Sequence, residues 1–474
     1  MPLHQLSVRN TASSQIQPAS KSKVFLIAII AATGGLLFGF DTGVISGALP
    51  FLKEYWKLSD KTLEWVTTAV LLGAVLGAVT SGKLSDYLGR KKMIIINAII
   101  FSVGALGCAF ASGIAMLMVM RVIVGIAIGI TSYVAPMYIA EVSPTRRRGA
   151  LVTLNQLMIT IGILVSYITD YLLSNDANLQ SWRLMFGVGL LPALILLIGM
   201  FFLPETPRWL ISKQRWEEGK KVLMQVEDPD LVEHTFNDLT EDVARSAEHK
   251  TRASEILKPW LRPALIITVG IFFFQQFSGV NTIIYYSPII FQMAGIVSTT
   301  KSIIPSIIIG TVNVLACLLS VFLLDRVGRR KLYMIGISGM IPSLALLGLC
   351  FYFKDALGAS LPVFAVLSIV CYIIFIAISL APLGWLLISE VFPLKVRGVG
   401  MSIGSLSHWG FNAIISFTFL TLVNSVGIAS TFWCYSLVCV AGLLWGYYYI
   451  PETKGKSLED IEKHWRSGGK PRNL

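Results

Sequence analysis

Two charged residues, Asp41 and Arg121, stand inside long apolar stretches of the sequence. A charge at membrane depth costs several kcal/mol unless it is paired or hydrated, so such residues are candidates for function. Asp41 lies about 17 residues into its stretch, roughly 26 Å along a helix, and Arg121 begins another stretch from the opposite side. The two would lie at similar depth, where they could form an ion pair.

An ion pair of this kind could handle a proton. A carboxyl group gains or loses a proton when its distance from an arginine or from water changes. A conformational change that separated Asp41 from Arg121 would therefore load or release a proton. We predict that the pair couples proton transfer to the conformational change. A static pair that fastens two helices, or one that reaches interfacial water, is the alternative.

The stretch 264–294 holds a dense set of uncharged polar side chains, namely Gln275, Gln276, Ser278, Asn281, Tyr285 and Tyr286. Lipid contact would not tolerate this density, so these side chains line something wet. Amides donate and accept hydrogen bonds and aromatic faces pack against C–H surfaces, which suits a neutral polyhydroxylated ligand better than an ion. Isolated residues of the same types elsewhere are Gln156, Asn313 and Trp385. Hydrogen bonding between helices is the alternative role for each.

His408 is the one histidine in an apolar stretch, and Trp409 and Asn412 follow it. Asn412 comes four residues later and so shares a helix face with His408. A hydrogen-bonded neutral imidazole and a proton site are both open interpretations. The six cysteines stand singly without metal-type spacing, so we expect no metal and no cofactor. No nucleophile, base and orienting group occur together, which makes an enzyme the least expected class.

The elements that carry these residues are membrane helices. Charged residues make up 14% of the 474 positions and apolar types 54%, whereas soluble domains average about 25% charged. Apolar stretches of roughly 18 to 26 residues recur, each long enough to cross a bilayer. We predict an all-α membrane protein with twelve transmembrane helices, near 24–49, 65–82, 93–111, 115–139, 150–173, 184–203, 264–294, 302–324, 332–353, 361–389, 399–424 and 430–450. Pro382 and Gly384 are expected to interrupt the tenth.

The sequence repeats itself, which predicts two bundles of six helices. The charged turn after Asp86 returns after Asp325, the turn from Glu141 to Arg148 returns from Glu390 to Arg397, and Pro204-Glu205-Thr206 returns as Pro451-Glu452-Thr453. The predicted divisions are a tail over 1–23, a first bundle over 24–204, a polar helical linker over 205–260, a second bundle over 261–450 and a tail over 451–474.

Lysines and arginines concentrate in the loops that carry the repeated turns, so the positive-inside rule places these loops and both termini in the cytoplasm. The net charge of +12 then reflects topology and contact with anionic membrane lipids. Nucleic-acid binding is not expected, because the cations are scattered among loops.

Several motifs together resemble the sugar porter family of the major facilitator superfamily across essentially the whole chain. They are Gly89-Arg90-Lys91-Lys92, Gly328-Arg329-Arg330-Lys331, Pro204 to Trp209, Gln275 to Asn281 and Pro451 to Gly455. The resemblance implies two six-helix bundles around a central monosaccharide site, with short cytoplasmic helices between them. It assigns sugar binding to Gln156, Gln275, Gln276, Asn281, Asn313, Trp385 and Asn412, with Tyr286, His408 and Trp409 beside them. It also implies a cytoplasmic gate of Arg90, Glu141, Arg148, Arg330, Glu390 and Arg397, for which solvated surface turns are the alternative.

The resemblance favours a bacterial proton-coupled symporter in the inner membrane, monomeric, because Phe40-Asp41 is similar to the symporters and facilitative uniporters typically lack the acid. His408 and Ile163 depart from the xylose-type pattern and favour a hexose such as glucose or galactose over a pentose. A facilitative sugar or polyol uniporter is the alternative. A sugar sensor that does not transport is a further one, although its usual long tails are missing from this sequence.

Overall fold

The computed structural model describes residues 21–144, 147–248, 253–393 and 395–474, and this part of the chain is helical without strands. Twelve helical segments in it are long and apolar enough to span a membrane. The first six spans are α1 (Lys21–Tyr55), α2 (Asp60–Leu88), α3 (Arg90–Ala109), α4 (Ile114–Val142), α5 (Arg148–Leu173) and the pair α6 (Ser181–Val188) and α7 (Leu190–Phe202). The other six are α11 (Arg262–Phe277) with α12 (Val280–Met293), α13 (Thr299–Val327), α14 (Arg329–Tyr352), α16 (Leu361–Ile378) with α17 (Leu380–Val391), α18 (Arg397–Val426) and α19 (Ile428–Tyr449).

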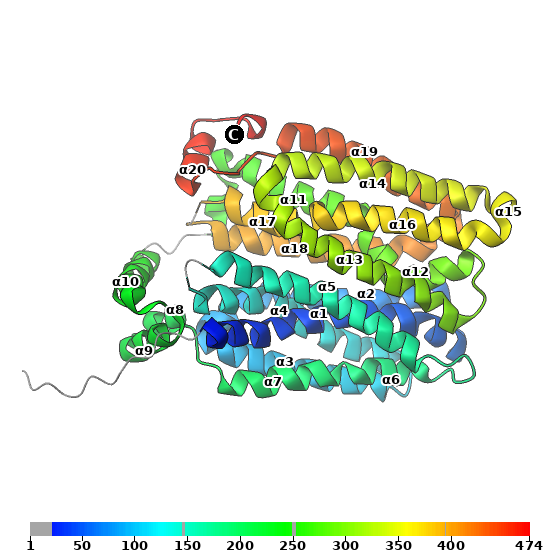
Figure 1. Cartoon of the computed structure of the whole chain (residues 1–474), viewed down its shortest axis with the longest axis horizontal. Helices are drawn as coiled ribbons and strands as arrows, with labels where there is room; N and C mark the ends of the chain where they lie inside the picture. Colours follow the sequence, from blue (N-terminus) through cyan, green and yellow to red (C-terminus); the bar gives the residue numbers. More distant parts are fainter. Residues whose placement is uncertain (1–20, 145–146, 249–252, 394) are drawn as a thin grey trace, which may run out of the picture.

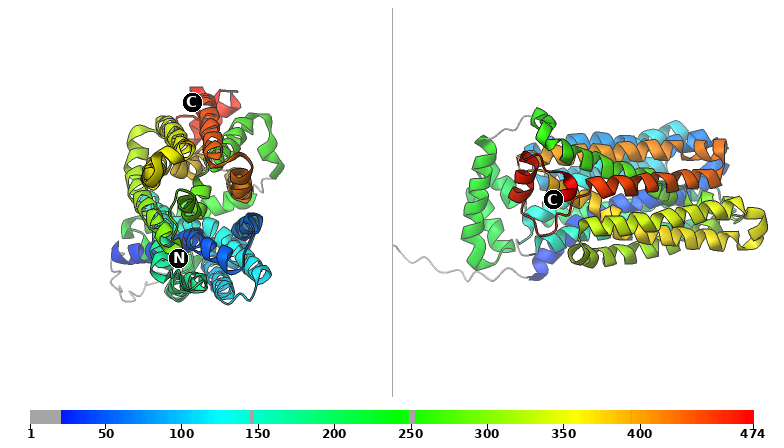
Figure 2. Two further views of the ribbon diagram at one scale, coloured as in Figure 1. Left: turned by 90° about the vertical axis from the view of Figure 1, so that its right-hand side faces the viewer. Right: turned by 90° about the horizontal axis from the view of Figure 1, so that it is seen from above.

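The spans form two bundles that lie side by side, α1–α7 in one and α11–α19 in the other (Figure 1). Between them in sequence come three helices outside the spans, α8 (Pro207–Ser212), α9 (Trp216–Val226) and α10 (Val232–Glu248), and the C-terminal segment adds α20 (Leu458–Arg466). All four lie at the same end of the bundles as both ends of the described chain (Figures 1 and 2). We call this end the terminal face. The opposite end, with α15 (Lys354–Leu357) and the loop between α5 and α6, is the distal face.

Glycines let the helices of the first bundle approach closely. A Cβ at Gly129 of α4 would lie 2.2 Å from the carbonyl oxygen of Ala74 in α2. One at Gly39 of α1 would lie 1.9 Å from the carbonyl oxygen of Ile159 in α5. Apolar surfaces gain little by association in lipid, so close backbone packing of this kind is a main source of cohesion between helices.

Two spans of the second bundle are broken near their middle. The first break separates α11 from α12 at Ser278 and Gly279, where Gly279 has φ +86°. Only glycine adopts this left-handed conformation without strain. The sequence had predicted one continuous helix over 264–294, so the break is a correction to that prediction.

The second break separates α16 from α17 at Ser379, not at Gly384 as the sequence had predicted. Gly384 is buried inside α17, against Phe272. Pro382 explains the position of the break, because a proline ring clashes with the carbonyl four residues earlier in a continuous helix. That carbonyl belongs to Ile378, the last residue of α16. The predicted interruption therefore exists, but it lies on the other side of the proline.

Candidate functional site

Asp41 and Arg121 form an ion pair in the interior of the first bundle. Arg121 Nη1 lies 2.5 Å from Asp41 Oδ1, and the two residues are 0% and 4% exposed. Asp41 Oδ2 and Arg121 Nε and Nη2 have no hydrogen-bond partner among the described residues. One bond therefore holds two charges that have further hydrogen-bonding capacity, so the pair is poised to exchange partners.

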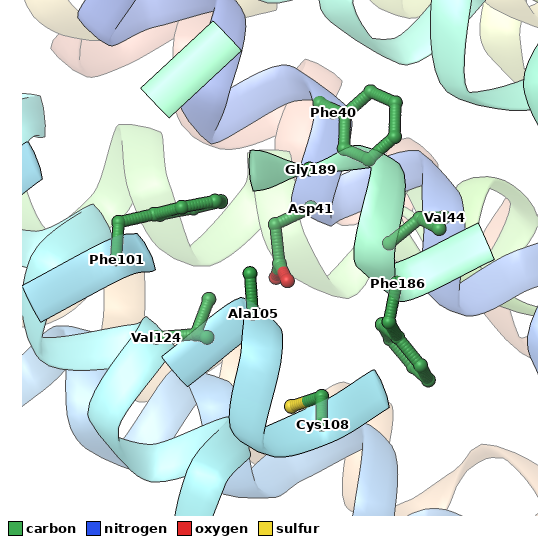
Figure 3. A pocket seen from close by; sticks show the side chains of 9 residues that line it. All are labelled: Phe40, Asp41, Val44, Phe101, Ala105, Cys108, Val124, Phe186 and Gly189. Atoms are coloured by element: carbon green, nitrogen blue, oxygen red, sulfur yellow. The ribbon is translucent and has the colours of Figure 1, made fainter. Parts of the chain in front are cut away.

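The Asp41 carboxyl points into a cavity of about 10 Å³ (Figure 3). The cavity lies among α1, α3, α4, α6 and Gly189, and apart from Asp41 its lining is apolar: Phe40, Val44, Phe101, Ala105, Cys108, Val124 and Phe186. A volume of this size holds about one water molecule. The ion pair is therefore nearly dry in this conformation, which makes a neighbouring cation decisive for the charge of the acid.

The predicted amide cluster forms at the two helix breaks of the second bundle. Gln275 Nε2 donates to the carbonyl oxygen of Leu380 at 2.8 Å, so α11 is joined to the first residue of α17, directly after the break. Gln276 Nε2 donates to Gln275 Oε1 at 3.1 Å, and Asn281 Nδ2 donates to Gln276 Oε1 at 2.7 Å. The three amides thus form one chain that crosses from α11 to α12 and fixes the geometry of both breaks.

His408 joins this chain from α18. Its Nδ1 lies 3.1 Å from Gln276 Nε2 and 3.2 Å from Gln275 Oε1, so it either accepts from the first amide or donates to the second. The imidazole ring packs against Phe272, Trp385 and Trp409. His408 therefore orients two amides and packs against the aromatic rings beside the cluster.

The remaining predicted ligands are distributed around this cluster. Asn412 donates to the hydroxyl of Tyr285, and the hydroxyl of Tyr286 donates to the carbonyl of Ser416. The ring of Trp409 lies 5.2 Å from that of Phe38 in α1, which brings the first bundle to the cluster. Gln156 in α5 and Asn313 in α13 are half-buried on two helices that pack together. No hydrogen bond in the described part of the chain joins either of them to the cluster.

Most of the hydrogen bonds that join the two bundles in the described residues lie in their distal half. Glu64 of α2 is 0% exposed and accepts 2.7 Å hydrogen bonds from the backbone N–H and the hydroxyl of Thr421 in α18. Asp176, in the loop after α5, accepts from Ser298 and from both the N–H and the hydroxyl of Thr300 at the start of α13. The distal side is therefore closed. Neither acid had been singled out from the sequence, because each stands at the edge of an apolar stretch.

These hydrogen bonds also affect the acidity of Asp176. Although partial burial opposes the effect, the donors on Ser298 and Thr300 hold the pKa of Asp176 below its ordinary value. Its ionised form therefore binds the start of α13 across the bundle interface, and α13 offers there the free backbone N–H groups of a helix N-terminus.

At the terminal face each bundle repeats one arrangement. Arg90 pairs with Glu141, whose carboxylate also accepts from the hydroxyl of Thr206. Glu205 accepts from the backbone N–H groups of Arg90 and Lys91 at the start of α3. Burial raises the pKa of Glu205, while these donors act in the opposite direction. The repeated turns of the sequence are thus anchors for helix ends.

The second copy corrects one predicted gate residue. Glu390 pairs with Arg329 at 2.9 Å and accepts from Thr453, whereas Arg330 donates to the carbonyls of Tyr447 and Ile450. Arg329 directly follows Gly328 as Arg90 follows Gly89, so the repeat itself could have identified it. Arg148 is exposed and Arg397 is half-buried, and neither forms a salt bridge in the described part of the chain.

Comparison with known proteins agrees with this geometry. The family model "Sugar (and other) transporter" matches residues 27–465. The galactose-proton symporter of Escherichia coli K12 is 38% identical over 96% of this chain and 97% of its own length. The arabinose-proton symporter of the same strain is 39% identical, covering 94% of each chain.

Solved structures give the same result. The inward open conformation of the xylose transporter XylE from E. coli matches with a TM-score of 0.80 and 30% identity, over 93% of this chain and 100% of that one. The fold predicted from the repeats, two bundles with twelve spans, is confirmed, and so is the predicted family resemblance. The chain belongs to the sugar (and other) transporter family, as a multi-pass membrane transporter and not an enzyme.

Proposed function

We propose that the protein carries a monosaccharide and a proton together across the bacterial inner membrane by alternating access. The observation that carries this proposal is the buried Asp41–Arg121 pair, which has one mutual hydrogen bond and three polar atoms without a partner among the described residues. A structural ion pair is normally saturated with partners, because unpaired buried polar groups are costly. An acid that must lose its arginine partner to bind a proton has this incomplete arrangement. The symporters among the relatives support the same assignment.

The proposed substrate site is the cluster of Gln275, Gln276, Asn281, His408 and Trp385, with Gln156, Asn313 and Asn412 as further ligands. The hydrogen bonds of its central amides are made to other amides, to His408 and to a backbone carbonyl, with no carboxylate or arginine among them. Neutral donors and acceptors beside aromatic faces match sugar hydroxyls and C–H surfaces. We favour a hexose, glucose or galactose, because Ile163 and His408 depart from the xylose-type pattern.

The proposal places the terminal face in the cytoplasm and the distal face outside. The loops at the terminal face carry the clustered cations, including Arg90 to Lys92 and Arg329 to Lys331. Such clusters remain on the cytoplasmic side of bacterial membranes. One chain is the proposed transporting unit, because it holds both bundles and the complete amide cluster. In this orientation the closed distal side corresponds to an inward-facing conformation.

The test is the external pH on addition of one sugar at a time to de-energised cells that contain the protein, with cells that lack it as the control. We expect the external pH to rise with one hexose and less or not at all with xylose or arabinose. Entry of radiolabelled sugar without a pH change, and without sensitivity to an uncoupler, would make the protein a uniporter. A pH rise with a pentose alone would retain symport and overturn the hexose assignment.

A further inference from the structure

A second buried acid lies near the distal end of the first bundle. Asp170, in the last turn of α5, is 0% exposed, and no side chain among the described residues donates a hydrogen bond to its carboxyl oxygens. α1 approaches it closely, because a Cβ at Gly47 would lie 2.4 Å from Asp170 Oδ2. An ionised carboxylate is strongly disfavoured in such a site, since the backbone N–H of Gly47 is the one donor beside it among the described residues and does not replace its lost hydration. The closed conformation therefore requires the protonated form of Asp170.

The charged groups of the surrounding elements do not compensate this acid. Tyr167 lies one turn earlier on α5, and its hydroxyl donates to the carbonyl of Ile284 and not to Asp170. The titratable groups on the helices packed against α5 here have other partners or reach the surface. Lys53 pairs with Asp60, Arg121 pairs with Asp41, and Arg183 donates to the carbonyl of Ala109. Lys301 lies towards Asp176, Tyr55 packs against Trp56 and Trp182, and Glu54 is exposed.

Asp170 lies beside the interface between the two bundles. The Tyr167 hydroxyl donates across the interface to Ile284 of α12 at 3.0 Å, and Ser46, next to Gly47, lies 3.3 Å from Ser287 of α12. Asp176, six residues after Asp170, binds the start of α13. Opening of the distal side must break these three contacts, and it would bring water to the α1–α5 seam at this point.

We propose that Asp170 is a second proton-binding residue, which takes one proton from the external solution when the distal side closes and returns it there when that side reopens. The step converts a carboxylate and a hydronium ion into a carboxylic acid and water. This inference rests on the proposed alternating access and orientation. Asp170 stays at the distal end throughout, so its proton does not reach the cytoplasm and does not enter the ratio of protons to sugar. Asp41 alone carries the transported proton.

The test is sugar exchange, which cycles the loaded transporter between its two sides without net proton transport. In an Asp41→Asn variant, the exchange rate is expected to fall as external pH rises into the alkaline range, by up to about tenfold per pH unit, because one proton must bind before closure. In the Asp41→Asn, Asp170→Asn double variant the rate should not change with external pH. Thermal unfolding of the purified variants checks that both are folded, and Asp170→Ser replaces Asp170→Asn if the latter is not.

Three results would overturn the inference. Exchange by Asp41→Asn that is independent of external pH would show that Asp170 does not gate closure, and an equal fall in the double variant would assign the effect to another group. The Asp170→Asn single variant gives a third check, because its ratio of protons to sugar should equal that of the wild type, whereas a lower ratio would make Asp170 a transported-proton site. If wild-type protein moved no proton with sugar, the proposed symport would fail, but the exchange experiment would still decide the role of Asp170.

Discussion

At the scale of single residues, charged side chains that are rare in apolar stretches indicated the chemistry. Asp41 and Arg121 could be identified from the sequence because charges inside apolar stretches are costly, and the structure brings the two side chains together. The partners of the amides could not be identified in the same way. Gln275 donates to the carbonyl of Leu380, the first residue of α17, directly after the break at Ser379. A hydrogen bond that depends on a helix break is invisible until the break is located.

Replacing Asp41 by Asn should abolish sugar accumulation and leave exchange. The amide keeps the shape of the acid but binds no proton, so the ratio of internal to external sugar should fall to unity in energised cells. Loss of one partner of a buried ion pair costs about 3–5 kcal/mol, so thermal stability should fall as well. The measurement is accumulation and exchange of radiolabelled sugar, with Asp355→Asn, an exposed acid of α15, as the matched control. Uphill accumulation by the Asp41 variant would refute the coupling role.

Replacing His408 by Asn should change which sugar is preferred and leave the pH dependence of transport unchanged. Asn retains a hydrogen bond to the amides but removes the ring contacts with Phe272 and Trp385. One hydrogen bond or ring contact is worth roughly 0.5–1.5 kcal/mol, which corresponds to at most about tenfold in relative affinity. Competition by a panel of hexoses and pentoses measures the first effect, and uptake against pH the second. A shifted pH profile would instead place His408 in proton coupling.

At the scale of helices, the spans were predictable and their breaks were not. Apolar length alone locates twelve spans, because the bilayer sets a minimum length. The break at Gly279 depends on a left-handed φ that many glycines never adopt, and the break at Ser379 lies on the side of Pro382 opposite to the predicted one. The pattern of apolar residues does not indicate either break, since the residues on both sides of a break are equally apolar.

Close helix packing predicts a sharp difference between two glycines. Gly129→Ala would place a Cβ 2.2 Å from the Ala74 carbonyl, so α2 and α4 must separate, at a cost of about 1–3 kcal/mol. Gly410→Ala, in α18, meets nothing within 4 Å and should stabilise the helix by up to about 1 kcal/mol. Thermal unfolding in detergent, followed by tryptophan fluorescence, should show a lower Tm for the first variant and an equal or higher one for the second. Equal melting temperatures would contradict the packing described for α2 and α4.

At the scale of the whole molecule, the duplication predicted two bundles but not the side on which they close. The internal anchors, Arg90 with Glu141 and Arg329 with Glu390, lie within bundles and persist in any arrangement of them. The contacts between the bundles distinguish one conformation from another. The same sequence must support both the conformation with the distal side closed and the one with it open. Glu64 and Asp176 each reach backbone N–H groups of the opposite bundle, so two carboxylates hold the distal side closed.

Neutralising either carboxylate should therefore open the distal side. Hydrogen bonds to a charged group contribute about 1.5–3 kcal/mol, so Glu64→Gln or Asp176→Asn should shift the ratio of open to closed molecules by roughly ten- to a hundredfold. The lowered pKa of Asp176 predicts that acidification also favours opening of the distal side. The Asp176 carboxylate stabilises the closed state while it is ionised, and this contribution is lost as pH falls through that pKa. Asp170 acts in the opposite sense, because closure buries it without a side-chain hydrogen-bond partner among the described residues.

Distances between spin labels measure this shift directly, in a background that lacks the exposed cysteines Cys371 and Cys434. Labels at Ala177 and Val297 report on Glu64→Gln, and labels at Lys57 and Val426 report on Asp176→Asn, so that each pair lies away from the substituted residue. The long-distance population should grow in both variants and stay unchanged in Asp355→Asn, which removes an exposed acid of α15 that makes no described contact with the first bundle. If the distances in all three variants match the wild type, closure depends on apolar packing between α2 and α18 and between α5 and α13, and the two carboxylates do not contribute to it.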